Sequence, residues 1–134
     1  MKNDFFSLVN DGSNDNSIKK MNATCAITYN PNKSETINFR FFDMRTTTGE
    51  HCSKSGVLFD AINSALDKHE ILWNNCVIIG LDNWKTNMGQ HNSIKSRVFQ
   101  NNDSCFIAGC GCHLAHLAAQ YGGKAFLKET GFSV

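Results

Sequence analysis

The sequence predicts an α/β domain with a mixed sheet, its elements in the order β-β-β-α-β-α-β-α. Residues 21–29 and 37–44 alternate between apolar and polar side chains, and this period of two is typical of strands. Residues 76–81 are apolar throughout, which favours a central parallel strand covered on both faces. Helical and strand-like segments then alternate to the end of the chain, as they do in α/β sheets.

The first three strands are predicted to form an antiparallel meander. A short apolar strand at 5–9 runs into a polar cluster at 10–16 that marks a turn, and residues 30–33 form the next turn. One face of the second strand collects its apolar residues: Met21, Ala23, Cys25, Ile27 and Tyr29. In the third strand the expected division is Ile37, Phe39 and Phe41 on one face and Phe42 and Met44 on the other.

Three later segments have helical periodicity. The first begins near Ser55, a residue suited to capping a helix. Its apolar stripe recurs every three or four residues: Val57, Leu58, Ala61, Ile62, Ala65 and Leu66. A second helix is expected from about 87 to 99 and a third from 113 to 128, with a short strand at 105–108 between them.

Length and composition indicate one folded domain spanning residues 1–134, with 41% hydrophobic and 19% charged residues. The 13 basic and 12 acidic residues leave a net charge of +1, whereas a stand-alone DNA binder carries a clear basic excess. The chain has no secretory signal and no apolar run of membrane-spanning length, and its scattered cysteines fit reduced thiols, so we expect a soluble intracellular protein. Both ends are abrupt, and we expect a fragment or a truncated gene copy.

Two carboxylates follow strands that are expected to be neighbours. Asp11 comes just past the first strand and Asp82 just past the fourth. Ligands of α/β sheets gather beyond the carboxyl ends of the strands, and paired carboxylates there bind hard divalent cations such as Mg²⁺. The alternative is structural, because Asp after a strand is also a common turn former and helix cap.

Cysteine and histidine crowd together at Cys110, Cys112, His113 and His116. Such a cluster suggests zinc, but the two cysteines stand closer together than the Cys pair of a zinc knuckle, and no second pair follows. The alternative is a buried cysteine packed beside the sheet, with a histidine cap at the start of the last helix.

Four motifs lie in order along nearly the whole chain: Asp11-Gly12-Ser13-Asn14-Asp15, Phe41-Phe42-Asp43, Asp82-Asn83-Trp84-Lys85-Thr86-Asn87-Met88-Gly89 and Cys110-Gly111-Cys112-His113. This series resembles the catalytic domain of the hAT-superfamily DNA transposases and of the transposon-derived proteins related to them. The resemblance implies a ribonuclease H-like fold, a nuclear location and, in the intact family, metal-dependent cleavage and strand transfer at the ends of transposon DNA.

By this resemblance Asp11 and Asp82 are the first two catalytic acids and hold Mg²⁺ or Mn²⁺, while Cys110 and His113 contact DNA. The family's third acid is a Glu on a later helix, and Glu129 lies too close behind His113 to match it. The upstream zinc finger and the C-terminal dimerisation region of the family are also missing, and Trp84 is expected to narrow the cleft.

Three functions follow from these observations. The first is a transposase catalytic fragment that is inactive alone because it lacks the third acid. The second is a transposon-derived domain that binds nucleic acid or protein without catalysis, and the third is a small Cys/His metal module. A sheet that ends at residue 134 would also lack the helix covering one face, so we expect exposed apolar surface and assembly with another piece. The resemblance also implies a homo-oligomer, formed through the family's regions that are missing here.

Overall fold

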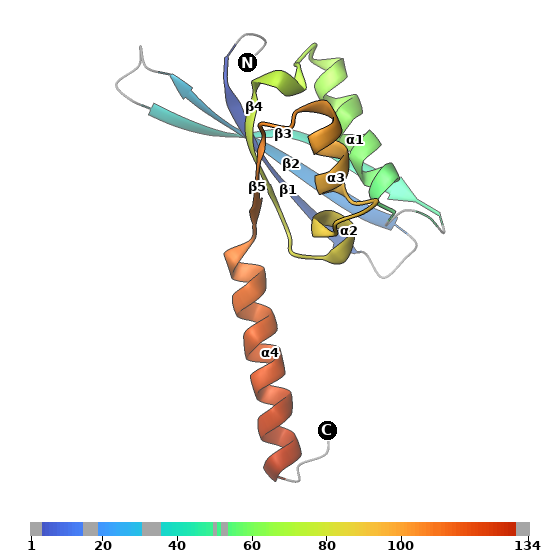
Figure 1. The fold of residues 1–134 in the computed structure, drawn as a ribbon, viewed down its shortest axis with the longest axis vertical. Coiled ribbons are helices and arrows are strands. Elements are labelled where there is room, and N and C mark those ends of the chain that lie inside the picture. The colour runs from blue at the N-terminus through green and yellow to red at the C-terminus, as the bar shows by residue number, and fades with distance from the viewer. Residues whose placement is uncertain (1–3, 15–18, 31–35, 50, 52–53, 131–134) are drawn as a thin grey trace.

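The computed structural model describes residues 4–14, 19–30, 36–49, 51 and 54–130, which form an α/β fold with one mixed sheet (Figure 1). The strands are β1 (Phe6–Asn14), β2 (Lys19–Asn30), β3 (Thr36–Thr48), β4 (Cys76–Leu81) and β5 (Phe106–Gly109). The helices are α1 (Ser55–Lys68), α2 (Lys85–Met88), α3 (Ile94–Asn101) and α4 (Gly111–Thr130), with a 3-10 turn, η1 (Trp73–Asn75), before β4. The predicted class is therefore confirmed, although one predicted helix is two.

The sheet has the order β3-β2-β1-β4-β5. β1, β2 and β3 form the predicted antiparallel meander, whereas β1, β4 and β5 run parallel to one another. β1 and β4 are neighbours, as expected. The carboxyl ends of β1, β4 and β5 consequently meet at the same edge of the sheet.

The predicted turn after the first strand is wrong over residues 10–14, because β1 continues through them to Asn14. These residues pair with β2 from Thr24 to Lys20. The buried Asn10 side chain supports the pairing by donating to Thr24 Oγ1 at 2.9 Å and to the Ala23 carbonyl at 3.3 Å. Asp11 therefore lies within a strand and not beyond it, while the predicted turn around Pro31 falls outside the described residues.

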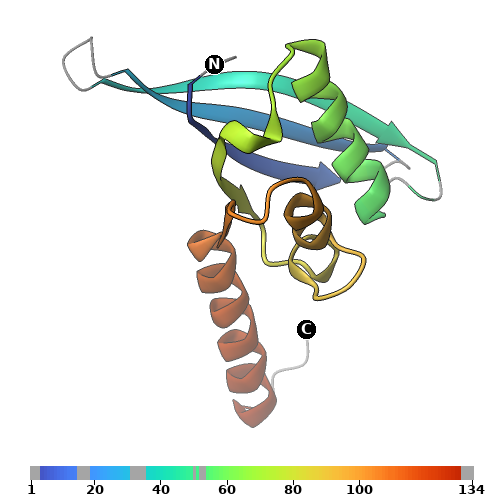
Figure 2. The same ribbon diagram turned by 45° about the horizontal axis from the view of Figure 1, so that its top comes forward.

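The core lies on one face of the sheet, beneath α1 and α3 (Figure 2). Both helices and the inward faces of the central strands contribute to it: Phe6, Leu8, Ala26, Leu58, Phe59, Ile62, Leu66, Ile79, Leu81, Ile94 and Val98 are all buried. The Phe59 and Trp73 rings stack with centroids 5.6 Å apart, and Trp73 Nε1 donates to Asn63 Oδ1 at 2.8 Å. The predicted stripe of α1 is confirmed, except that Val57 is exposed and Ala61 is only partly buried.

Ser55 does not cap α1. Lys54 holds the capping position without a side-chain hydrogen bond, and Ser55 is the first helical residue. Its hydroxyl instead donates to the Asn92 carbonyl at 2.6 Å, which ties the start of α1 to the loop before α3.

The single helix predicted at 87–99 is wrong, since α2 and α3 are separate. A capping box at Ser93 starts α3: the Ser93 hydroxyl accepts from Ser96 N at 3.1 Å, and Ser93 N donates to the Ser96 hydroxyl at 2.9 Å. Asn92, directly before the cap, has the left-handed φ of 49° that no continuous helix permits. Asn92 and Ser93 therefore interrupt the helix, although the apolar periodicity of the segment continues past them.

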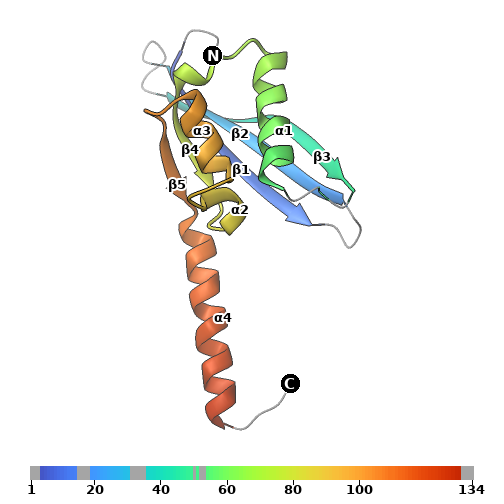
Figure 3. The same ribbon diagram turned by 45° about the vertical axis from the view of Figure 1, so that its right-hand side comes forward.

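The other face of the sheet carries no helix of the described chain (Figure 3). We call its apolar part the open face, and its members are Val9 of β1, Met21, Ala23, Cys25, Ile27 and Tyr29 of β2, Ile37, Phe39, Phe41 and Met44 of β3, Ile78 of β4 and Phe106 of β5. Two expectations are corrected here. The fourth strand is covered on one face only, and Met44 shares the face of Phe41, because a bulge at Phe42 shifts the β2–β3 register between Thr24 and Cys25.

Helix α4 projects beyond the carboxyl edge of the sheet in all three views (Figures 1–3). Over 111–125, where its side chains are described, only His113 and Leu117 are partly covered and the rest are exposed. Of the apolar side chains that predicted this helix, Leu114, Ala118 and Tyr121 are therefore left uncovered by the described chain.

Candidate functional site

A cavity of about 610 Å³ opens at the carboxyl ends of β1, β4 and β5. Its lining comes from the three strand ends and the first turn of α4: Val9, Asn10, Asp11, Gly12, Gly80, Leu81, Asp82, Ala108, Gly109, Cys110, Cys112 and His113. All four site residues expected from sequence, Asp11, Asp82, Cys110 and His113, lie on its wall. Three parallel strands bring together residues from opposite ends of the chain.

The two carboxylates reach the cavity from different structural settings. Asp11 stands on β1 opposite Ala23 and is exposed, on the same side of the sheet as Val9. Asp82 follows β4 directly and is half-buried. Among the described residues no hydrogen bond engages the Asp11 carboxylate, so both of its oxygens are available to a ligand.

Asp82 is held in place by its own loop. Its Oδ1 atom accepts hydrogen bonds from Trp84 N at 2.9 Å and from Asn87 Nδ2 at 2.6 Å. Within the part of the chain that the structure describes, Oδ2 accepts none. One oxygen is therefore used to fix the side chain and the other remains free.

Asn87 is a site residue that belongs to the Asp82 motif, although no role for it was predicted from the sequence. It is buried at 7% exposure on α2, and its Nδ2 supplies the second bond to Asp82. Its Oδ1 atom is buried and accepts no hydrogen bond from the described residues. The five-residue spacing from Asp82 was the available signal, because a loop followed by one helical turn brings such a pair together.

The start of α4 is fixed to the end of β4. Cys110 N donates to the Leu81 carbonyl at 2.9 Å, and Asn83 Nδ2 donates to the Cys110 carbonyl at 2.7 Å. The same carbonyl accepts from Leu114 N at 3.2 Å and so begins the helix. Asn83, which belongs to the same motif and for which no role was predicted either, therefore links the Asp82 loop to the cysteine-histidine segment.

The structural alternative for Cys110 and His113 is wrong in its details. Cys110 and Cys112 are exposed and not packed beside the sheet, and His113 lies inside the first turn of α4 instead of capping it. Within the described ranges, no group of three His, Cys, Asp or Glu side chains is placed to hold a metal ion. Trp84 is 61% exposed and does not line the cavity, so it does not narrow it.

A second sulfur pair lies in the core, away from the cavity. Cys76 and Cys105 are buried with their sulfur atoms 3.9 Å apart, and both are free thiols. Burial raises the pKa of Cys76, and the neighbouring Cys105 raises it further. Burial also raises the pKa of Cys105, although its hydrogen bond with Cys76 opposes the shift. Both thiols are consequently poor nucleophiles near neutral pH.

We expect thiol reagents to separate these two groups of cysteines. In a Cys52→Ser background, Cys110 and Cys112 should react with a disulfide reagent on the order of 100-fold faster than Cys76 and Cys105, which react only after local opening. Peptide mass spectrometry after timed quenching gives each rate. Equal rates at all four positions would contradict the burial of Cys76 and Cys105.

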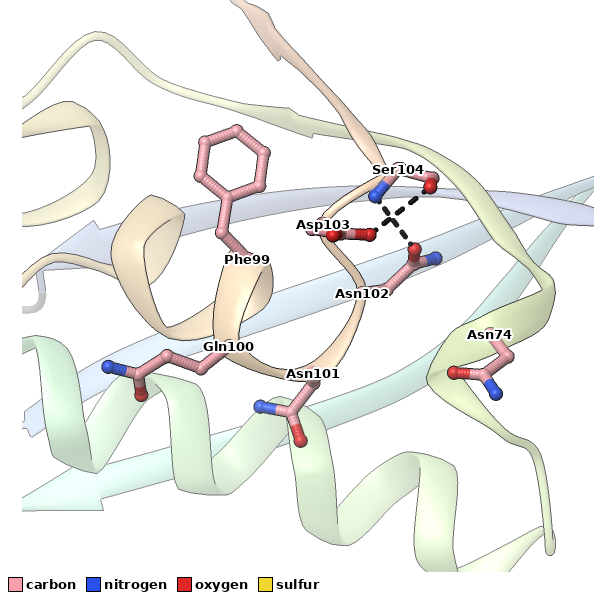
Figure 4. Close-up of a pocket in the computed structure, with 7 residues that line it drawn as sticks. All are labelled: Asn74, Phe99, Gln100, Asn101, Asn102, Asp103 and Ser104. Atoms are coloured by element: carbon pink, nitrogen blue, oxygen red, sulfur yellow. Dashed lines mark hydrogen bonds between the residues drawn. The ribbon is translucent and has the colours of Figure 1, made fainter.

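Another hollow, of about 450 Å³, lies at the end of α3 (Figure 4). Its lining side chains are mostly exposed and polar, and Asn102 is committed to structural bonds: its Oδ1 accepts from Ser104 N at 3.1 Å. The Ser104 hydroxyl in turn contacts Asp103 at 3.2 Å. This hollow presents no convergent set of acids, bases or nucleophiles, so the cavity at the carboxyl edge is the candidate site.

No helix of the described residues has the length and apolar character needed to cross a membrane. No protein family model matches this chain, and no curated protein and no solved structure is significantly similar to it.

Proposed function

We propose that this chain is the N-terminal part of a hAT-type DNA transposase catalytic domain with a ribonuclease H-like fold, and that the cavity is its DNA-processing site. The observation that carries the proposal is that Asp11, Asp82, Cys110 and His113, selected from their motifs, all line one cavity. The sheet order β3-β2-β1-β4-β5 agrees with it, because Asp11 on β1 lies beside the end of β4, and Asp82 directly follows β4.

The donor set fits a divalent cation of the Mg²⁺ or Mn²⁺ type. Such ions prefer oxygen ligands, and Asp11 and Asp82 Oδ2 offer carboxylate oxygens with no hydrogen bond from the described residues. When bound, the ion supplies charge stabilisation for a phosphodiester under attack by water or a 3′-hydroxyl. Asn87 and the Trp84 amide keep Asp82 facing the cavity by occupying its other oxygen.

The opposite wall suits a phosphate group. The first turn of the 20-residue helix α4 lies there, and a helix N-terminus attracts anions through its free backbone N–H groups and its dipole. His113 adds an imidazole that lines the same space. A DNA phosphate in the cavity would then have the two carboxylates on one side and the start of α4 on the other.

Catalysis by these residues alone is expected to be weak. Two carboxylates hold a second ion poorly, and the described part of the chain places no third carboxylate at the cavity. The same observation favours the second candidate, a transposon-derived domain that binds nucleic acid or protein without cleaving DNA.

Calorimetry with Mg²⁺ and Mn²⁺ tests the metal site. We expect the unmutated chain to bind an ion at the cavity and the Asp11→Asn/Asp82→Asn variant to bind at least about tenfold more weakly, a difference of about 1.4 kcal/mol or more. A matched variant, Asp60→Asn/Asp103→Asn, removes two exposed acids elsewhere and should bind as the unmutated chain does.

Two results decide between the candidates. Two observations together support a catalytic fragment that lacks its third acid. Ion binding depends on Asp11 and Asp82, and the nicking of supercoiled DNA in the presence of manganese does not rise above background. An unmutated chain that binds neither ion overturns the metal site and leaves the non-catalytic binding domain.

A further inference from the structure

The open face exposes more contiguous apolar area than the largest apolar patch of a typical monomer. Ile37 is 69% exposed, Phe39 64%, Phe41 66% and Tyr29 54%. Since an aromatic side chain presents about 150–250 Å², these residues and their apolar neighbours expose on the order of 800 Å². The largest apolar patch of a typical monomer is about 300–600 Å².

Helix α4 carries a second unpartnered apolar surface. Leu114, Leu117, Ala118, Tyr121 and Ala125 recur every three or four residues and form one stripe along it. Leu114 is 55% exposed and Tyr121 68% exposed. A helix of 20 residues is about 30 Å long, and the 12-residue strand β2 is about 40 Å long, so the open face is long enough to accommodate the helix.

The junction before α4 directs the helix away from its own sheet. Cys110 is the only residue between β5 and α4, and both of its backbone groups are engaged, with Leu81 and with Asn83. These bonds set the strand-to-helix turn that the structure has. In this arrangement the stripe of one chain does not lie on the open face of the same chain.

We propose that a second copy of this chain covers the open face with its α4, in a reciprocal exchange that gives a two-fold symmetric dimer. Each copy offers one helix and one face, so the exchange closes at two copies. The open face alone supplies about the 800 Å² per partner that a stable interface requires. A hollow of about 240 Å³ on this face, lined by Phe5, Ile27, Tyr29, Ile37 and Val77 among others, would receive an apolar side chain of the partner helix.

Sedimentation velocity over a range of concentrations tests the dimer with paired variants. Phe41→Glu places a charge on the open face, and Tyr121→Glu places one on the α4 stripe. Each should raise the dimer dissociation constant at least about tenfold. Arg40→Glu, exposed on the other face of β3, and Gln120→Glu, off the α4 stripe, should leave it unchanged.

Mixing the two disruptive variants tests the exchange itself. The Phe41→Glu chain keeps a competent helix and the Tyr121→Glu chain keeps a competent face, so the mixture should form heterodimers at concentrations where each variant alone is monomeric. Circular dichroism confirms that both variants fold, which is expected because both side chains are exposed.

Three results would overturn the proposal. One is an unmutated chain that stays a folded monomer at every concentration. Another is a dimer that Phe41→Glu disrupts but Tyr121→Glu does not, because two sheets would then pack face to face without α4. The third is assembly beyond two copies, since a reciprocal exchange leaves no open surface.

Discussion

Replacing Leu66 by alanine should lower the free energy of unfolding by about 2–5 kcal/mol. Leu66 has no exposed surface and lies near the end of α1, in the layer of side chains that packs against the sheet. The described core occupies one face of the sheet only, so no second layer compensates for a cavity there. Because native domains are stable by about 5–15 kcal/mol, this single change removes a large part of the total.

Leu72→Ala is the matched control, because the same atoms are deleted six residues later from a side chain that is 64% exposed. Its effect should stay within about 0.5 kcal/mol. Urea unfolding followed by circular dichroism, at one protein concentration for all variants, measures both changes. Similar losses for Leu66→Ala and Leu72→Ala would show that α1 is not packed as described.

Period-two alternation predicted the strands well, because burial on one side of a sheet imposes it directly. In β2 the five alternating residues from Met21 to Tyr29 do share one face. In β3 the same reasoning failed at Met44, since one bulged residue reverses the face of everything after it. No residue type at the bulge distinguishes Phe42 from its neighbours, so the pattern alone does not locate the shift.

The sequence motifs named four residues that line the cavity, but they did not predict how the backbone positions them. Asp82 follows its strand as expected, whereas Asp11 lies inside a strand whose polar residues had suggested a turn. That strand is held by pairing with β2 and by the Asn10 side chain, contacts that are distant in sequence. The supporting amides, Asn83 and Asn87, belong to the Asp82 motif, but their supporting role was not predicted because asparagine is also an ordinary loop residue.

The position of α4 illustrates the same limit on a larger scale. Its apolar periodicity predicted a helix, and Gly111–Thr130 is one. Periodicity implies that a partner surface exists, but it does not say whether that surface belongs to the same chain. The direction of α4 is set by bonds at Cys110 that join it to Leu81 and Asn83, residues of a different strand and loop.

Asn102 provides the second large expected effect, because one side chain joins three segments. Its Nδ2 donates to the Trp73 carbonyl and to the Cys76 carbonyl, each at 2.9 Å, and its Oδ1 accepts from Ser104 N at 3.1 Å. These bonds hold the end of α3 against the entry to β4 and shape the turn into β5. Trp73 and Cys76 are buried, so their carbonyl groups have little access to water as a replacement.

We therefore expect Asn102→Ala to lower the free energy of unfolding by about 2–4 kcal/mol, since it leaves buried carbonyl groups without donors. Asn101→Ala removes a similar amide whose bond, to the Arg97 carbonyl, is exposed, and it should cost about 1 kcal/mol or less. Urea unfolding compares the two variants. Equal losses would mean that Asn102 acts only as the residue that ends α3. A larger loss for Asn102→Ala would mean that this one amide controls the alignment of β4 and β5, and with it the geometry of the cavity.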